Sequence, residues 1–175
     1  RVPFVSYPYE WCFAQLKHAA LVTLRIQEIA LGKGMSLKDA SAYNVQFRGG
    51  KPVLIDTLSF ERYREGRPWI AYRQFCQHFL APLALMAYRD VRLSKLLQNH
   101  IDGIPLDLAA RLLPLRTRLR PGLAIHLHAH AATQKRHQAA GKPKKPAVIS
   151  MRAMLAIVDN LRAAVRRLEW KSGDT

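Results

Sequence analysis

Two carboxylates and one amide stand in the first third of the chain, in an order that suits phosphoryl transfer. Asp39 is followed five residues later by Asn44, and Asp56 comes twelve residues after Asn44. Phosphoryl transfer needs a carboxylate that accepts or orients the substrate hydroxyl, and oxygen ligands that hold Mg²⁺ against the phosphates. We therefore take Asp39 as the candidate catalytic residue, and Asn44 and Asp56 as candidate ligands of Mg²⁺ and of a nucleotide, ATP.

The elements expected around these residues would hold them at fixed distances. Apolar residues at helical spacing, followed by glycines, predict a helix over residues 12–31, and a loop is expected over residues 35–43. Residues 45–56 predict a β-hairpin with its turn at Gly49 and Gly50, and the second strand ends at Asp56. This order of helix, loop, hairpin and carboxylate resembles the C-lobe of protein kinases.

The pattern also departs from that of protein kinases. Leu37 stands where the catalytic loop usually has His, and Ser41 stands where many kinases have Lys. Asp56 is followed by Thr57 rather than by Phe and Gly. A Gly-rich loop and the Lys that grips ATP would have to precede Arg1. A kinase-like site in this chain is therefore either active or vestigial.

A second, strongly apolar helical pattern follows the hairpin. It covers residues 69–95, with a kink or break expected at Pro82. Its aromatic residues share one face, which predicts a buried central helix beneath the loop of Asp39. These residues are Trp69, Tyr72, Phe75 and Phe79. Arg73 in the same helix is expected to be a buried anchor for that loop.

The fold class predicted from these patterns is mainly α with one small β-hairpin, a kinase-like C-lobe. Residues 1–133 would form this domain and residues 134–149 a basic linker. Residues 150–171 predict a last helix capped by Ser150, which would tether a further C-terminal domain. Because the chain opens without Met, we expect a fragment of a larger protein.

The positive charge is concentrated in the last third of the chain. The net charge is +16, and residues 111–175 hold 14 Lys and Arg against three Asp and Glu, a net charge of +11. One interpretation is a basic nucleic-acid-binding module, and the other is a charged linker. The aromatic side chains that single-stranded nucleic acid stacks upon are missing between Tyr88 and Trp170, so nucleic acid is the disfavoured partner.

Cysteine usage and hydropathy favour a cytoplasmic protein. Cys12 and Cys76 form no Cys-x-x-Cys pattern, which fits a reducing compartment. The apolar runs are too short to span a membrane, and the start of the chain does not resemble a signal peptide.

Four histidines suggest a weaker metal hypothesis. On a helix, His126, His130 and His137 would share one face while His128 points away. Zinc sites often add a carboxylate ligand, but the sequence has no Asp or Glu between positions 107 and 159. A basic amphipathic helix is the favoured interpretation, and the role of the histidines is left open.

Several long strings resemble the N-terminal region of bacterial class I methyltransferases related to nodulation host-specificity proteins. They are Ser6-Tyr7-Pro8-Tyr9-Glu10-Trp11, Ser36-Leu37-Lys38-Asp39-Ala40-Ser41-Ala42-Tyr43-Asn44, Ile55-Asp56-Thr57-Leu58-Ser59-Phe60, Tyr72-Arg73-Gln74-Phe75-Cys76-Gln77-His78-Phe79 and Ile101-Asp102-Gly103-Ile104-Pro105-Leu106-Asp107. The resemblance implies a parent methyltransferase that binds S-adenosylmethionine in a separate domain after Thr175, with an unknown methyl acceptor. This chain would then be its accessory region, either kinase-like or a non-catalytic scaffold that packs on the methyltransferase domain.

Overall fold

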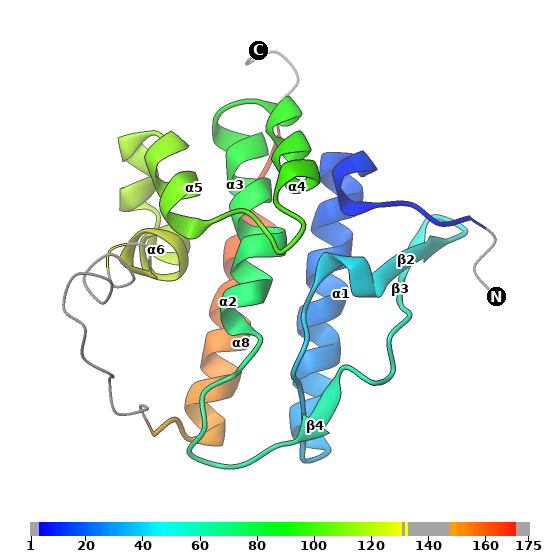
Figure 1. The fold of residues 1–175 in the computed structure, drawn as a ribbon. Coiled ribbons are helices and arrows are strands. Elements are labelled where there is room, and N and C mark those ends of the chain that lie inside the picture. Colours follow the sequence, from blue (N-terminus) through cyan, green and yellow to red (C-terminus); the bar gives the residue numbers. More distant parts are fainter. Residues whose placement is uncertain (1–3, 131, 133–147, 171–175) are drawn as a thin grey trace.

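The structure, a computed structural model, describes residues 4–130, 132 and 148–170. The body consists of helices α1 (Phe13–Gly32), α3 (Ala81–Tyr88) and α8 (Met151–Arg167), and small strand pairs lie along α1 (Figure 1). The described part is therefore mainly helical, as predicted.

Helix α1 confirms the helix predicted from the first apolar repeat. Its buried face includes Leu16, Ala20, Leu24 and Leu31, which recur at helical spacing. After the last turn, Gly34 takes a φ of 71°, a left-handed conformation that lets the chain leave the helix. The helix ends within one residue of the predicted position because this stop signal is local.

The predicted hairpin is present. Strand β2 (Val45–Arg48) pairs antiparallel with β3 (Lys51–Leu54), and the turn between them has φ values of 55° at Gly49 and 74° at Gly50. Two successive positive φ values define the tight turns that glycine favours. The hairpin thereby fixes the path of the chain from Asn44 to Asp56.

A second strand pair was not predicted. Strand β1 (Met35–Leu37) pairs antiparallel with β4 (Phe60–Arg62), whereas the sequence predicted a loop from residue 35 onward. Strands of three residues are too short to show an alternating pattern, and each depends on a partner that is distant in the chain. This pair closes the loop of Asp39 at its base.

The central helical segment runs without interruption from α2 (Tyr72–Phe75) through a π-helical turn (Cys76–Leu80) into α3. Proline inside an α-helix lacks an N–H and clashes with the carbonyl four residues earlier. The wider π-helical turn ends two residues before Pro82, and the helix continues through Pro82 without the predicted break. Three predicted core aromatics are buried here, namely Trp69, Phe75 and Phe79.

Short helices complete the body. They are α4 (Leu96–Asn99), α5 (Leu106–Leu112), α6 (Pro121–Leu123) and a second π-helical turn (Ala124–Ala129). Turns of 3₁₀ helix occur at Pro8–Glu10, Ala42–Asn44, Val91–Lys95 and Leu115–Leu119. Helices α5 and α6 lie on the opposite side of α3 from the strands (Figure 1).

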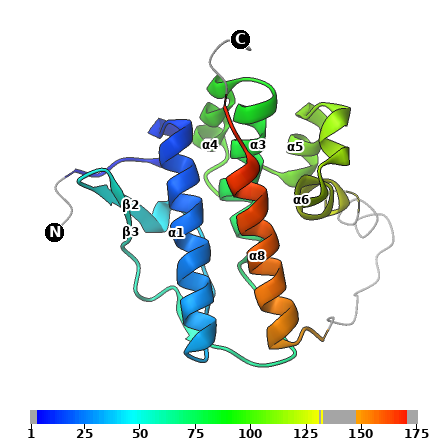
Figure 2. The ribbon, with the colours of Figure 1, turned by 180° about the vertical axis from the view of Figure 1, so that it is seen from behind.

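Helix α8 begins at the predicted cap and packs alongside α1 (Figure 2). The Ser150 Oγ accepts a hydrogen bond of 3.3 Å from the Ala153 N–H. At the other end, the Lys17 Nζ of α1 donates to the carbonyls of Arg166 (2.9 Å) and Leu168 (2.7 Å). The apolar face of α8 belongs to the same hydrophobic core as α1 and α3.

The segment before α8 lies largely outside the described residues, including most of the predicted basic linker of residues 134–149. Where the description resumes, Ile149 and Gly66 exchange two backbone hydrogen bonds of 3.1 and 3.2 Å. Within the described ranges, every helix falls short of the length and apolar character that crossing a membrane requires.

Candidate functional site

The loop between β1 and β2 holds Asp39 in a defined conformation. Its carboxylate Oδ1 accepts a hydrogen bond of 2.9 Å from the Ser41 N–H, and the Ser41 Oγ accepts one of 3.2 Å from the Tyr43 N–H. Short polar side chains that bond to the backbone two residues on stabilise turns in this way. Asp39 is half-buried.

Two side chains anchor this loop, one from the segment before α2 and one from α2 itself. The Trp69 Nε1 donates to the Leu37 carbonyl (2.8 Å), and the Gln74 Oε1 accepts from the Ala40 N–H (2.7 Å). Arg73, the anchor predicted from the sequence, is instead exposed, so that prediction is wrong. Successive residues of a helix point about 100° apart, and Gln74 is the one on the loop side.

Ser59 joins two of the predicted site residues. The Asn44 Nδ2 donates to the Ser59 Oγ (3.0 Å), which donates to the Asp56 Oδ2 (2.6 Å). The Ser59 carbonyl accepts from the Lys38 N–H (2.8 Å), so the segment after the hairpin is tied to the loop of Asp39. Ser59 was not among the predicted site residues, because no histidine is placed by the sequence to activate it as a nucleophile, although its position three residues after Asp56 is typical of a turn closed by a side chain.

The carboxylate of Asp56 is stabilised in its charged form. Its pKa is lowered first by the hydrogen bond from Ser59, then by the one from the Leu58 N–H, and further by the positive charge of Lys38. A carboxylate that accepts two hydrogen bonds is ionised at neutral pH. Asp56 therefore supplies a fixed negative charge beside Asn44.

His78 is a second ionisable group near the loop. It lies in the first π-helical turn, is 1% exposed, and packs edge to face against Tyr43 with ring centroids 6.1 Å apart. Burial lowers its pKa to about 4, and the charges of Asp39 and Asp102 act in the opposite direction. His78 is therefore a neutral imidazole at pH 7.

The donor set at the predicted site suits a hard cation. Asp56 accepts one hydrogen bond on each carboxylate oxygen, and Asn44 uses its amide nitrogen as the donor to Ser59. Both side chains thus retain oxygen lone pairs, which Mg²⁺ prefers, and a nucleotide phosphate would supply further oxygens. Among the described residues, no three His, Cys, Asp or Glu side chains are grouped to hold a metal by themselves.

The histidines in and directly after the second π-helical turn divide between two neighbours. The His126 Nδ1 lies 2.7 Å from the Tyr72 hydroxyl, and the His130 ring lies 5.0 Å from that of Tyr72. The His128 Nε2 instead lies 2.8 Å from the Thr117 hydroxyl. His128 points away from the other two, as predicted, and His137 lies outside the described residues.

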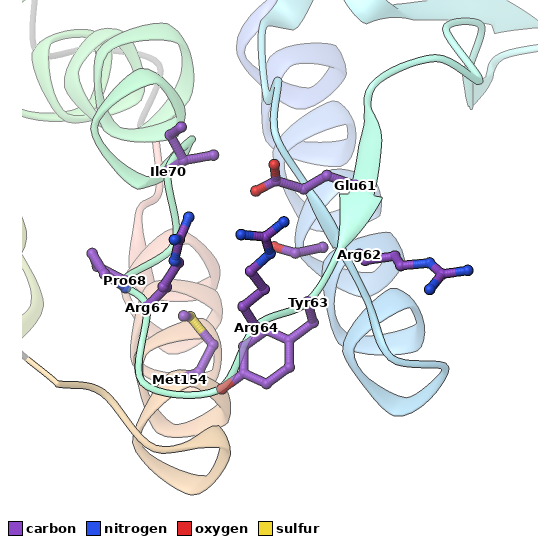
Figure 3. A pocket seen from close by; sticks show the side chains of 9 residues that line it. Glu61, Arg62, Tyr63, Arg64, Arg67, Pro68, Ile70 and Met154 are labelled. Atoms are coloured by element: carbon purple, nitrogen blue, oxygen red, sulfur yellow. The ribbon is translucent and has the colours of Figure 1, made fainter.

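A hollow of about 370 Å³ lies below the loop, beside Ser36 of β1 (Figure 3). Its lining mixes charges, because the guanidinium groups of Arg64 and Arg67 project into it from one side and the carboxylate of Glu61 from another, while Arg62 points away. This hollow depends on the β1–β4 pair, which has no local sequence signal, so the hollow was not predicted from the sequence.

The sequence of the chain is similar to that of a curated nodulation protein. It is 42% identical over 123 residues to "Nodulation protein NoeA" of Rhizobium meliloti (strain 1021), and the match covers 70% of this chain and 26% of that protein. The chain thus spans about a quarter of the length of this curated relative. No family model matches the chain, and no solved structure matches it. The similarity supports a relationship to nodulation proteins.

Proposed function

We propose that this chain is the kinase-like accessory region of a larger protein and binds Mg²⁺ with a nucleotide at Asp39, Asn44 and Asp56. The observation that carries this proposal is the hydrogen-bonded chain from Asn44 through Ser59 to Asp56. It holds an amide and an ionised carboxylate beside a loop that carries a second carboxylate. Asp39 would accept or orient a substrate hydroxyl, and the other two residues would ligate the metal.

The order of the elements supports the same proposal. Helix α1 leads through β1 into the loop of Asp39, the β2–β3 hairpin then leads to Asp56, and β4 returns to pair with β1. Trp69 and Gln74 hold the loop from the helical side, so its backbone is fixed before any ligand binds. A preorganised loop is what positioning in phosphoryl transfer requires.

A non-catalytic scaffold is the second candidate function. Leu37 stands at the position of the kinase histidine and is fully buried in β1, and its carbonyl accepts a hydrogen bond from Trp69. Both oxygens of Asp56 also serve hydrogen bonds within the chain. Each of these features is sufficient for a structural role without metal or nucleotide.

We also propose that this chain, whether it is kinase-like or a scaffold, packs on a methyltransferase domain of the larger protein, and that this domain binds S-adenosylmethionine. The described residues contain only antiparallel strand pairs, whereas a dinucleotide-type cofactor site is built on parallel strands and a Gly-rich turn. The methyl-transfer chemistry would therefore belong to another part of the protein.

Melting temperature distinguishes the two candidate functions of the chain. We expect Mg²⁺ with ATP to raise the melting temperature of the wild-type chain, and Asp56→Asn to abolish the rise because it removes the charge that attracts the metal. Asp107→Asn is the matched control, since Asp107 pairs with Arg111 on the surface of α5. If neither Mg²⁺ nor ATP, alone or together, raises the melting temperature of the wild-type chain, the Mg²⁺ and nucleotide site is excluded and the non-catalytic scaffold is the remaining function.

A further inference from the structure

A second cavity lies next to the hollow of Figure 3, on the other side of the segment of residues 68–70. Its volume is about 520 Å³, within the range of small-molecule sites in proteins. Pro68 and Ile70 line both spaces, so this short segment separates them. The other walls come from α2, the second π-helical turn and α8.

The lining of this cavity is mostly apolar. Trp69 and Ile157 belong to its walls, and Ile70 and Ile125 are 67% and 55% exposed. Large aliphatic side chains that gather around a cavity while still exposed to water favour an apolar occupant, because covering them removes apolar surface from water. The cavity therefore suits a ligand with an apolar body.

His126 adds a polar group to the wall. It is 3% exposed, its Nδ1 is bonded to the Tyr72 hydroxyl, and its Nε2 lacks a partner among the described residues. Burial lowers the pKa of His126 to about 4 and raises that of Tyr72, so the ring is neutral and Tyr72 keeps its proton. The roles in the Tyr72–His126 bond depend on the tautomer of the ring. In the tautomer with its hydrogen on Nε2, Tyr72 donates to Nδ1 and Nε2 can donate to an acceptor of a ligand.

Arg73 supplies the positive charge. It is exposed on α2 and lines the cavity, and no carboxylate pairs with it in the part of the chain that the structure describes. The described lining contains no Asp or Glu. Burial and, second to it, the nearby charge of Arg73 lower the pKa of His130. An unpaired guanidinium beside two neutral imidazoles matches an anion that accepts hydrogen bonds.

We propose that this cavity binds a small amphipathic carboxylate, with its apolar body against Trp69 and Ile70 and its carboxylate at Arg73. The site goes beyond the proposed Mg²⁺ site and shares no residue with it. The lining of the cavity includes none of Asp39, Asn44, Ser59 and Asp56, so decanoate binding and the Mg²⁺ response are tested at different residues.

Isothermal titration of the whole chain with decanoate, below its micellar concentration, tests the proposal. Decan-1-ol has the same apolar body without the charge. We expect Arg73→Gln to weaken decanoate binding about tenfold, the loss of one charge-assisted hydrogen bond, and to leave decan-1-ol binding unchanged. Ile70→Asp is expected to weaken both ligands, because it places a charge at the apolar rim.

Matched variants separate the cavity from the rest of the surface. Arg64→Gln removes a guanidinium from the neighbouring hollow, and Ile101→Asp changes an isoleucine that is 64% exposed elsewhere. Both should bind decanoate as the wild type does. The proposal is overturned if the wild type gives no binding heat with decanoate, or if Arg73→Gln or Ile70→Asp binds it with unchanged affinity.

Discussion

The hydroxyl of Ser59 links the side chains of Asn44 and Asp56, two of the residues predicted from the sequence to form a site. It is 1% exposed and serves at once as acceptor for Asn44 and as donor to Asp56. A buried hydroxyl with both functions engaged fixes the relative position of its partners, because each bond restricts the direction of the other. The spacing of Asn44 and Asp56 therefore depends on a third residue.

The buried imidazole of His78 makes the stability of the protein depend on pH. Its folded pKa of about 4 lies below the unfolded value near 6.5, so the unfolded chain binds more protons between these limits. The stability is complete above about pH 6.5 and is lost as the pH falls toward 4. From pH 7 to pH 5 we expect His78 to account for a loss of about 2 kcal/mol, measured by urea unfolding.

Substitution of His78 isolates this contribution from that of other acid-sensitive groups. His126 also has a lowered pKa and adds a loss in the same pH range, whereas Asp56, a carboxylate with a lowered pKa, adds its loss only at more acidic pH. His78→Gln should reduce the fall in stability between pH 7 and pH 5, while His18→Gln, on the exposed side of α1, should leave it as in the wild type. An equal fall in wild type and His78→Gln would contradict the assignment.

At the scale of elements, the sequence predicted those parts whose signals are local. Helices α1 and α8 and the β2–β3 hairpin each carry their own period, cap or glycine turn, and the structure has them where expected. The β1–β4 pair carries no such signal, because short strands are defined by their partner. The anchors of the loop were misassigned for a related reason: only the packed helix decides that Gln74, not Arg73, faces the loop.

The contact between α6 and α8 leaves no space for an added methyl group. A Cβ at Gly122 would lie 2.5 Å from the Ala164 Cβ, closer than atoms can approach. We expect Gly122→Ala to lower the free energy of unfolding by about 1–3 kcal/mol, as overpacking typically does. Gly32→Ala is the control, since a Cβ there meets no atom within 4 Å. Equal urea midpoints for the two variants would show that α8 is not tightly held.

Across the whole molecule, α8 contributes core rather than surface. Met154, Val158, Leu161 and Val165 are at most 1% exposed, and Arg162 bridges to Glu28 of α1 at 2.8 Å. Part of the basic excess of the last third thus belongs to a helix whose opposite face is buried. The charge distribution alone could not separate this packed helix from a linker.

Removal of α8 tests its place in the core. A chain that ends at residue 149 would expose the apolar faces of α1 and α6 that α8 covers. We expect it to lose cooperative thermal unfolding, followed by circular dichroism, whereas a chain that ends at residue 170 should melt as the full chain does. A cooperative transition at an unchanged temperature in the shorter chain would mean that the remaining elements form a complete core.

The π-helical turn before Pro82 also sets the rotational phase of the central helix. A π-helical turn holds more residues than an α-helical one, so the faces of the segments before and after it are offset from those of a regular helix. Trp69 and Gln74, which anchor the loop, precede the π-helical turn in the chain, and the buried residues of α3 follow it. Deletion of one residue within Cys76–Leu80 would rotate the two parts by about 100°, so loop anchoring and core packing could no longer be satisfied together.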